Sequence, residues 1–376
     1  MLIELTAAQR ALQAELRDYF EALLSPAERD AMATDRHGPA YHEVIRRMGR
    51  DGWLGLGWPL EYGGRGLGPV EQQIFVNEAA RADVPLPSVT LQTVGPTLQA
   101  HGTAEQKEFF LPRILAGDIH FAIGYSEPEA GTDLAALRTR AVRDGDGYLV
   151  NGQKTFTTGG HAADYVWLAC RTDPDAPRHK GISILIVDTT DPGYYWTPII
   201  TCDGAHHINA TYYSDVRVPA TRLVGAENAG WRLITTQLNH ERVMLGPAGR
   251  LGALHRRVCD WAATGPAEHP DVRRALARSY AHLRVNELLN WQVATAPAVD
   301  IADASATKVY SSEALQRLGQ EFEEAVGRHG DPDGELSSWL DVQAKRNLVL
   351  TFGGGVNEIQ RELIASAGLG LPRVPR

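Results

Sequence analysis

The sequence predicts an α+β, mostly α protein, with a helical domain over residues 1–120, a β-domain over residues 121–224 and a helical domain over residues 225–376. Three observations support this prediction. A chain of 376 residues is too long for one hydrophobic core and should divide into two or three domains. Apolar residues recur at helical spacing in the first and last parts. The middle part has short apolar runs between turn signals, which is typical of a β-sheet.

The composition narrows the possible functions. With 43% hydrophobic and 22% charged residues, it is ordinary for a soluble globular enzyme. A formal net charge of −9 disfavours a nucleic-acid binder, which needs a basic face. Apolar runs stay shorter than the ~18 residues that span a membrane, and the N-terminus does not resemble a signal peptide. Cys170, Cys202 and Cys259 are too scattered for a disulfide framework, so we expect a reducing, cytoplasmic location.

The first part of the chain has helical periodicity and start signals. One helical face carries Leu5, Leu12, Leu16, Tyr19 and Leu23. Capping boxes are expected at Thr6 with Gln9, Ser25 with Glu28, and Thr103 with Gln106. Glycine-rich and proline-rich stretches at residues 63–66 and 84–87 predict loops between the helices.

The middle part predicts strands near residues 165–169 and 182–187, where the side chains are mostly apolar. Turns are expected at Asp144-Gly145, Asn151-Gly152 and Pro192-Gly193. Helical periodicity returns from residue 225, with loops expected near Gly265-Pro266, Pro297 and Gly330-Asp331-Pro332.

The segment from Ile123 to Leu134 carries short hydroxyl groups and Gly131. Such a stretch can approach a flavin ring edge and a pyrophosphate closely, or it can simply turn between a helix and a strand. The run Asn151-Gly-Gln-Lys-Thr-Phe-Thr-Thr-Gly-Gly160 follows it. Together the two runs resemble the flavin loops of acyl-CoA dehydrogenases, T-E-P-x-A-G-S-D and N-G-x-K-x-W-I-T-N-G.

This resemblance implies a set of FAD contacts. Ser126 and the Tyr125 amide should face the pyrimidine edge of the flavin, and Thr132, next to Gly131, should face the pyrophosphate. The remaining contacts should come from the second run, at Phe156, Thr157 and Thr158. Phe156 should pack on the ring system, although it could instead be an ordinary core aromatic. Thr158 should bond the ring nitrogen N5, which receives the hydride.

A later helix, Gln237 to Leu245, carries Glu241 and Arg242 among apolar neighbours. A Glu-Arg pair on a helix is most often a solvated face. A carboxylate at an apolar boundary, however, has a raised pKa that suits a general base. In the family one layout has the base at this helix position, and the substrate-contacting arginine aligns with Arg242.

The run Thr351-Phe-Gly-Gly-Gly-Val-Asn-Glu-Ile-Gln-Arg361 is similar to the family motif Y-E-G-T-x-x-I-Q. Gly354 occupies the position where many members carry the base. Glycine cannot remove a proton, but its N–H can polarise the thioester oxygen. The resemblance therefore assigns proton removal to Glu241 and substrate polarisation to Gly354. Asn357 and Glu358 should lie near FAD, or could cap a helix that begins at about residue 356.

A metal site is not expected. His206 and His207 are adjacent and cannot easily chelate one ion together. His240 has no cluster of cysteines or carboxylates to complete a ligand set.

The resemblance covers essentially the whole chain and implies an acyl-CoA dehydrogenase-like fold with a C-terminal four-helix bundle. The implied activity is FAD-dependent oxidation of an acyl-CoA thioester to the trans-2-enoyl-CoA, with an electron-transfer flavoprotein as acceptor. The wording of the motifs is most similar to actinobacterial subunits that pair with a second, different subunit. Those subunits oxidise the shortened side chain of steroid CoA thioesters, a β-oxidation step in cholesterol degradation. A fatty or short branched-chain acyl group, a non-catalytic partner role, and flavin oxidase or monooxygenase chemistry remain alternatives.

Two family motifs are missing. Homotetrameric members carry Arg-x-x-Phe-Gly and Gln-x-x-Gly-Gly runs that reach the FAD of a neighbouring subunit. Here the corresponding segments are Trp261–His269 and Ala325–Pro332, and neither supplies those groups. A dinucleotide unmatched over half its length binds poorly. We therefore expect a second, different subunit to complete the site in an α₂β₂ heterotetramer.

Overall fold

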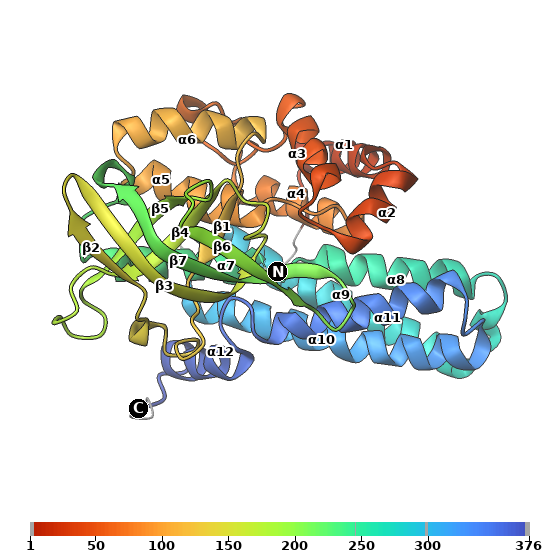
Figure 1. Ribbon diagram of the computed structural model, residues 1–376. Helices are drawn as coiled ribbons and strands as arrows, with labels where there is room; N and C mark the ends of the chain where they lie inside the picture. Colours follow the sequence, from red (N-terminus) through yellow and green to blue (C-terminus); the bar gives the residue numbers. More distant parts are fainter. Residues whose placement is uncertain (1–3, 245, 298–299, 373–376) are drawn as a thin grey trace. The chain divides into compact units, whose positions relative to one another are not determined.

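The computed structural model describes residues 4–244, 246–297 and 300–372, without the side chains of Thr34 and of residues 238–244. The first helices are α1 (Ala7–Leu23), α2 (Pro26–Thr34), α3 (Pro39–Arg50), α4 (Pro69–Arg81), α5 (Gly95–His101) and α6 (Ala104–Ala116). The strands are β1 (Phe121–Gly124), β2 (Arg140–Asp144), β3 (Gly147–Thr158), β4 (Tyr165–Arg171), β5 (Ile182–Asp188), β6 (Tyr194–Ile200), β7 (His206–Pro219) and β8 (Leu223–Val224). The last helices are α7 (Gly230–Met244), α8 (Ala248–Ala262), α9 (Pro270–Thr295), α10 (Ile301–His329), α11 (Glu335–Asn347) and α12 (Asn357–Leu363). This order confirms the predicted α+β, mostly α fold (Figure 1).

The chain forms two compact units, each assembled from segments far apart in the sequence. The helical unit combines Met1–Leu24, Leu67–Leu86 and Asn239–Arg376. The sheet unit combines Ser25–Gly66 and Pro87–Leu238. These units follow contacts rather than chain order, so the domain boundaries at residues 120 and 224 remain a prediction.

In the helical unit, the long helices α8, α9, α10 and α11 run side by side (Figure 1). Leu315, Leu318 and Phe322 of α10 are buried at spacings of three and four, the interval at which side chains share a helix face. They pack with Leu251 and Leu254 of α8 in one apolar core. Helices α1 and α4 pack against each other in the same unit.

The sheet unit contains a sheet with the strand order β6-β7-β3-β2-β4-β5-β8, and β1 pairs with β4 in parallel. Strands β4 and β5 are buried along nearly their whole length, which explains why their side chains are mostly apolar. Strands β2 and β3 form a hairpin in which Asp144 pairs with Gly147. The turn predicted at Asp144-Gly145 is therefore confirmed.

The turn predicted at Asn151-Gly152 is wrong, because β3 continues through both residues. The register with β7 shifts between Val150 and Gly152, and Gly152 has a φ of 149°. A glycine can adopt this angle within a β-bulge. The Asn-Gly pair, which predicted a turn, therefore lies at a β-bulge instead. The Asn151 side chain donates to Asp215 of β7 at 2.9 Å, which holds the two strands together there.

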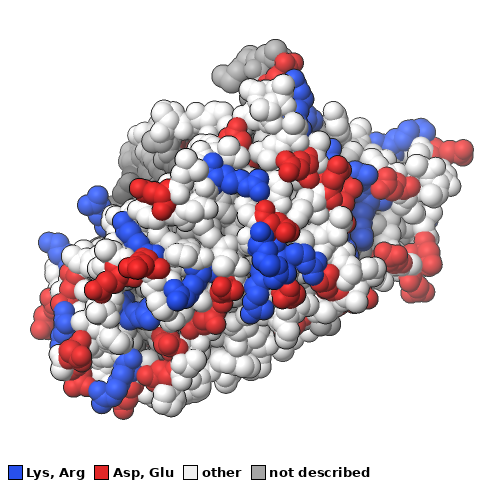
Figure 2. Space-filling model, turned by 90° about the horizontal axis from the view of Figure 1, so that it is seen from above, with Lys and Arg blue, Asp and Glu red and all other residues white. Residues whose placement is uncertain are grey.

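Acidic and basic side chains are mixed across the face of the molecule drawn in Figure 2. Exposed ion pairs include Arg217 with Asp144 at 2.7 Å and Arg178 with Asp133 at 3.0 Å. Exposed pairs of this kind contribute little to stability. These exposed charges are therefore no guide to the fold.

Candidate functional site

The two predicted flavin segments meet in the sheet unit. The N–H of Thr155 in β3 donates to the carbonyl of Ser126 at 2.8 Å. Ser126 is half-buried, and Tyr125 before it is 7% exposed. The end of β1 is thereby joined to the part of β3 that precedes Phe156. Segments about thirty residues apart in the chain are thus held together.

A buried ion pair that sequence reasoning missed lies beneath this junction. The Lys154 ammonium is fully buried and donates to Glu127 Oε1 at 2.8 Å and to the Tyr125 carbonyl at 3.0 Å. Glu127 also accepts from the backbone N–H groups of Arg138 and Thr139 at 2.6 and 2.8 Å. Burial opposes its ionisation, but Lys154 and these donors outweigh burial and hold the pKa of Glu127 below its ordinary value. The pair fixes the loop around Ser126.

Phe156 points out of the sheet at a second bulge in β3. The register with β7 shifts between Lys154 and Thr157, and Phe156 has a φ of 59°, which is rare for an aromatic residue. Its side chain is 63% exposed, so it is not a core aromatic in this chain. Strained backbone of this kind persists where the surroundings hold it, often at functional sites. Thr158, two residues on, is also exposed.

Thr157, between them, points the other way. Its side chain is fully buried, with its hydroxyl 3.2 Å from that of Thr211. Its carbonyl accepts from Asn209 Nδ2 at 3.1 Å. Thr157 thus anchors the exposed Phe156 and Thr158 to β7. The contact of Thr157 with FAD stays a prediction. Because the hydroxyl is buried, the backbone of Thr157 would have to make that contact.

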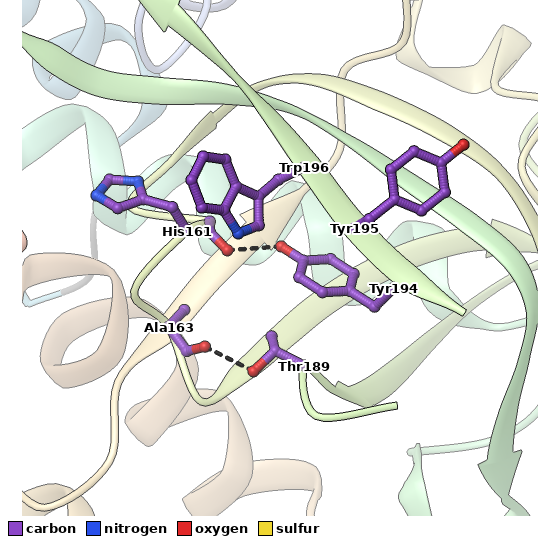
Figure 3. A pocket seen from close by; sticks show the side chains of 7 residues that line it. His161, Ala163, Thr189, Tyr194, Tyr195 and Trp196 are labelled. Atoms are coloured by element: carbon purple, nitrogen blue, oxygen red, sulfur yellow. Dashed lines mark hydrogen bonds between the residues drawn. The ribbon is translucent and has the colours of Figure 1, made fainter. Parts of the chain in front are cut away.

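The loop after Thr158 borders a pocket of about 270 Å³ (Figure 3). The pocket is lined by Gly160, His161, Ala163, Thr189, Tyr194, Tyr195 and Trp196. The Tyr194 hydroxyl donates to the Gly160 carbonyl and the Thr189 hydroxyl to the Ala163 carbonyl, each at 2.7 Å. These bonds hold the loop that follows the second flavin segment.

Gly131 and Thr132 are exposed. A Cβ added at Gly131 would meet no described atom within 4 Å, and Gly131 does not have a positive φ. Neither the packing nor the backbone angle of the described chain therefore requires glycine there. An open approach beside exposed hydroxyls and amides fits the pyrophosphate of a dinucleotide.

The late glycine run lies in the helical unit, in a loop whose carbonyl groups accept hydrogen bonds from Lys308. Gly354 is buried with a φ of 65°, and its carbonyl accepts from Gln360 Nε2 at 3.2 Å. The buried Lys308 ammonium donates to the carbonyls of Thr351 and Gly355 at 3.1 and 2.9 Å. Positive φ angles at Gly354 and Gly355 explain why glycine occupies both positions.

Asn357 and Glu358 behave differently from each other. Asn357 is 3% exposed, accepts from Lys308 Nζ at 2.6 Å and donates to Ser312 Oγ at 3.0 Å. Glu358 is exposed. The preceding Val356 is the N-cap of α12 and forms no side-chain cap. The alternative that Asn357 or Glu358 is the N-cap of this helix is therefore wrong. The contacts of Asn357 and Glu358 with FAD stay a prediction.

Glu241, Arg242 and His240 lie on the last turns of α7. Their side chains fall outside the described residues. Among the residues that the structure describes, no group of three or more His, Cys, Asp or Glu side chains could hold a metal ion. His206 instead stacks on His161, with ring centroids 4.0 Å apart.

The two segments that lack the family's FAD-reaching motifs contact each other in the helical unit. The rings of His269 and His329 stack with centroids 3.8 Å apart, and His329 Nε2 lies 2.9 Å from Asp271 Oδ2. A Cβ added at Gly330 would lie 3.1 Å from Trp261 Nε1. These side chains are therefore engaged at one end of the bundle.

Family models match almost the whole chain in three consecutive parts. They are the N-terminal domain of acyl-CoA dehydrogenase over residues 6–118, the middle domain over 122–232 and the C-terminal domain over 228–369. In the described part of the chain, no helix combines the length and apolarity needed to cross a membrane.

Individual relatives are similar over their full length. The chain is 68% identical to acyl-CoA dehydrogenase FadE29 of Mycobacterium tuberculosis, covering 100% of both proteins. A solved structure described as the Tcur3481-Tcur3483 steroid ACAD has a TM-score of 0.94 and 49% identity, covering 100% of each chain. The crystal structure of the ChsE4-ChsE5 complex from Mycobacterium tuberculosis has a TM-score of 0.92 and 48% identity, again covering 100% of each chain.

Proposed function

Because this chain belongs to the acyl-CoA dehydrogenase family, whose members oxidise CH–CH bonds, we propose that it uses FAD to convert an acyl-CoA thioester to the trans-2-enoyl-CoA. The observation that carries the proposal is the hydrogen bond from Thr155 N–H to the Ser126 carbonyl. It joins the two segments that resemble flavin loops. The exposed Phe156 and Thr158 lie directly beside that junction.

Glu241 is the proposed general base, which takes the α-proton of the thioester. The Gly354 N–H is assigned to the thioester oxygen, where it stabilises the negative charge that develops as the proton leaves. Arg242 is assigned to substrate binding. Bound FAD would supply the chemistry that accepts the hydride from the β-carbon. Tyr125, Ser126, Gly131 and Thr132 are assigned to its binding, as are Phe156, Thr157, Thr158, Asn357 and Glu358.

The proposed acyl group is a steroid side chain of the cholesterol type. The solved structure that supports this is described as a steroid ACAD, and it is 49% identical to this chain over the full length. A fatty or short branched acyl group is the competing substrate. The ratio of kcat/KM for a steroid-CoA thioester to that for octanoyl-CoA decides between them, and a ratio below one excludes the steroid assignment.

We also assign the chain to an α₂β₂ heterotetramer with two FAD molecules and an electron-transfer flavoprotein as acceptor. Two similar solved structures are each described by the names of two proteins, Tcur3481-Tcur3483 and ChsE4-ChsE5. The segments Trp261–His269 and Ala325–Pro332 lack the family motifs that reach a neighbour's FAD. In this chain they instead stack His269 on His329. A second subunit would then supply the missing FAD contacts.

The test is to express the chain alone and together with a candidate partner subunit. The complex should hold one FAD per pair of unlike chains, and its yellow absorbance should bleach without oxygen when a steroid-CoA thioester is added. A stable, fully flavinated homotetramer of this chain alone would refute the heteromer. Hydrogen peroxide or hydroxylated product formed under air without any CoA thioester would instead identify an oxidase or monooxygenase.

A further inference from the structure

Gln237 is a buried polar residue on the face of α7 that packs into the sheet unit. Leu233, Ile234 and Gln237 are 5%, 0% and 2% exposed, whereas Thr235 and Thr236 are exposed. Buried positions therefore recur at intervals of three and four along the helix. Position 241 follows about one helical turn further along α7.

The hydrogen bonds of Gln237 have directions that can be assigned without ambiguity. The indole N–H of Trp167 can only donate, and it donates to Gln237 Oε1 at 3.2 Å. The Tyr125 hydroxyl also donates to Oε1. On the other side, Gln237 Nε2 donates to Thr97 Oγ1 at 2.9 Å. The Thr97 hydroxyl is free to accept because its own proton goes to the Thr93 carbonyl at 2.7 Å.

Through these bonds one side chain connects α7 to several other elements of the sheet unit. Trp167 belongs to β4, Thr97 to α5, and Tyr125 directly follows β1 in the first flavin segment. Trp167, Tyr125 and Thr97 are all buried, at 0%, 7% and 8% exposure. Buried hydrogen bonds that are fully satisfied are stronger than exposed ones and specify a single arrangement.

An apolar side chain at position 237 would fill the same space but would not fix the helix in the same way. Apolar contacts have no preferred direction, so they permit α7 to rotate or slide slightly. A leucine would also leave the Trp167 N–H and the Tyr125 hydroxyl without their buried acceptor. The directional hydrogen bonds of the amide therefore restrict both rotation of α7 about its axis and sliding along that axis at this position.

We infer that Gln237 is a positioning residue for the dehydrogenation, which holds α7 at Gln237 in a fixed position against Tyr125, Trp167 and Thr97 of the sheet unit. This inference rests on the proposed function, in which Glu241 is the base. Proton removal depends on placing the carboxylate correctly, and a misplacement of about 1 Å can reduce a rate by about 10²-fold. Gln237 itself touches neither the substrate nor the flavin in this assignment.

Gln237→Leu in the flavinated complex tests the inference. With the steroid-CoA thioester as the probe, flavin reduction should slow by roughly ten- to a hundredfold. KM should change by less than about twofold, because substrate binding groups are unchanged. As a readout independent of activity, backbone amides of α7 should exchange hydrogen faster than in the wild type, since the helix has lost its anchor.

Gln106→Leu is the matched control. Gln106 is 4% exposed in the same unit and donates to the Thr221 and Leu223 carbonyls, each at 2.8 Å. Its loss removes a similarly buried amide without touching α7. This variant should lose stability while keeping the flavin reduction rate and the α7 exchange of the wild type.

Thr97→Val provides a milder test if Gln237→Leu does not fold. It removes the acceptor of Gln237 Nε2 with little change of shape and should slow reduction in the same direction by a smaller factor, while Thr97→Ser should restore the rate. The inference is overturned if Gln237→Leu, or Thr97→Val in its place, matches Gln106→Leu in reduction rate and α7 exchange. If Glu241→Gln also keeps its activity, the proposed function has failed; if Glu241→Gln is inactive, only the positioning role has failed.

Discussion

The ammonium nitrogen of Lys154 lies 2.8 Å from Glu127 Oε1 in the interior of the sheet unit, beneath the junction of the two flavin segments. Removing one partner of a buried pair leaves an uncompensated charge. Lys154→Met should therefore lower the free energy of unfolding by about 3–5 kcal/mol. Urea unfolding of the two single variants and of the double variant Glu127→Gln/Lys154→Met measures this. The double variant should lose less than the sum of the two single losses, and strict additivity would contradict the pairing.

The pH dependence of that pair has a definite sign. The pKa of Glu127 is lowered from 4.5, because Lys154 and backbone N–H donors outweigh burial. A lowered carboxyl pKa adds stability that is present above the unfolded value and is lost as the pH falls through the folded value. The stability difference between wild type and Glu127→Gln should stay constant above 4.5 and shrink below it. A difference that grows on acidification would refute this.

Lys308 should be a structural support for the late glycine loop. It is 1% exposed, and its ammonium donates to the Thr351 and Gly355 carbonyls and to Asn357 Oδ1. Lys308→Met leaves these acceptors without that donor and should reduce the free energy of unfolding by about 1–3 kcal/mol. Lys345→Met is the control, because Lys345 pairs with Asp341 at the surface and should contribute less than about 1 kcal/mol. Equal losses in chemical unfolding would argue against the support.

Gly131 and Gly355 should respond differently to alanine. A Cβ at Gly131 meets no described atom within 4 Å, whereas at Gly355 it would lie 2.5 Å from Gln360 Nε2 at a φ of 92°. Gly131→Ala should change the free energy of unfolding by less than about 0.5 kcal/mol yet weaken FAD binding, because the methyl group occupies the cofactor's approach. Gly355→Ala should unfold more easily. Unchanged flavin affinity in Gly131→Ala would remove that residue from the site.

Local patterns in the sequence predicted much of the fold. Thr6, Ser25 and Thr103 each form the expected capping box, because a cap depends only on residues three positions apart. The mostly apolar runs at residues 165–169 and 182–187 became β4 and β5, because such a run is itself a local signal of a buried strand. The Asn-Gly signal at residues 151–152 misled because a bulge and a turn both favour glycine.

Contacts between distant parts of the chain could not be predicted in this way. Tyr125 and Gln237 are 112 positions apart, and only the folded sheet unit brings them together. Lys154 and Glu127 each lie within a quoted motif, but their pairing depends on β3 passing beneath the loop. In the site itself, the exposure of Phe156 results from a bulge in β3. That bulge is visible only in the register between β3 and β7, which the sequence does not reveal.

The central claim is that Glu241 removes the substrate's α-proton, and Glu241→Gln tests it most directly. In the flavinated complex, anaerobic mixing with a steroid-CoA thioester should show binding of substrate but flavin reduction slowed by at least about 10²- to 10⁴-fold. Glu324→Gln, which changes an exposed carboxylate on α10, should reduce its flavin at the wild-type rate. Near wild-type flavin reduction in Glu241→Gln would contradict the account.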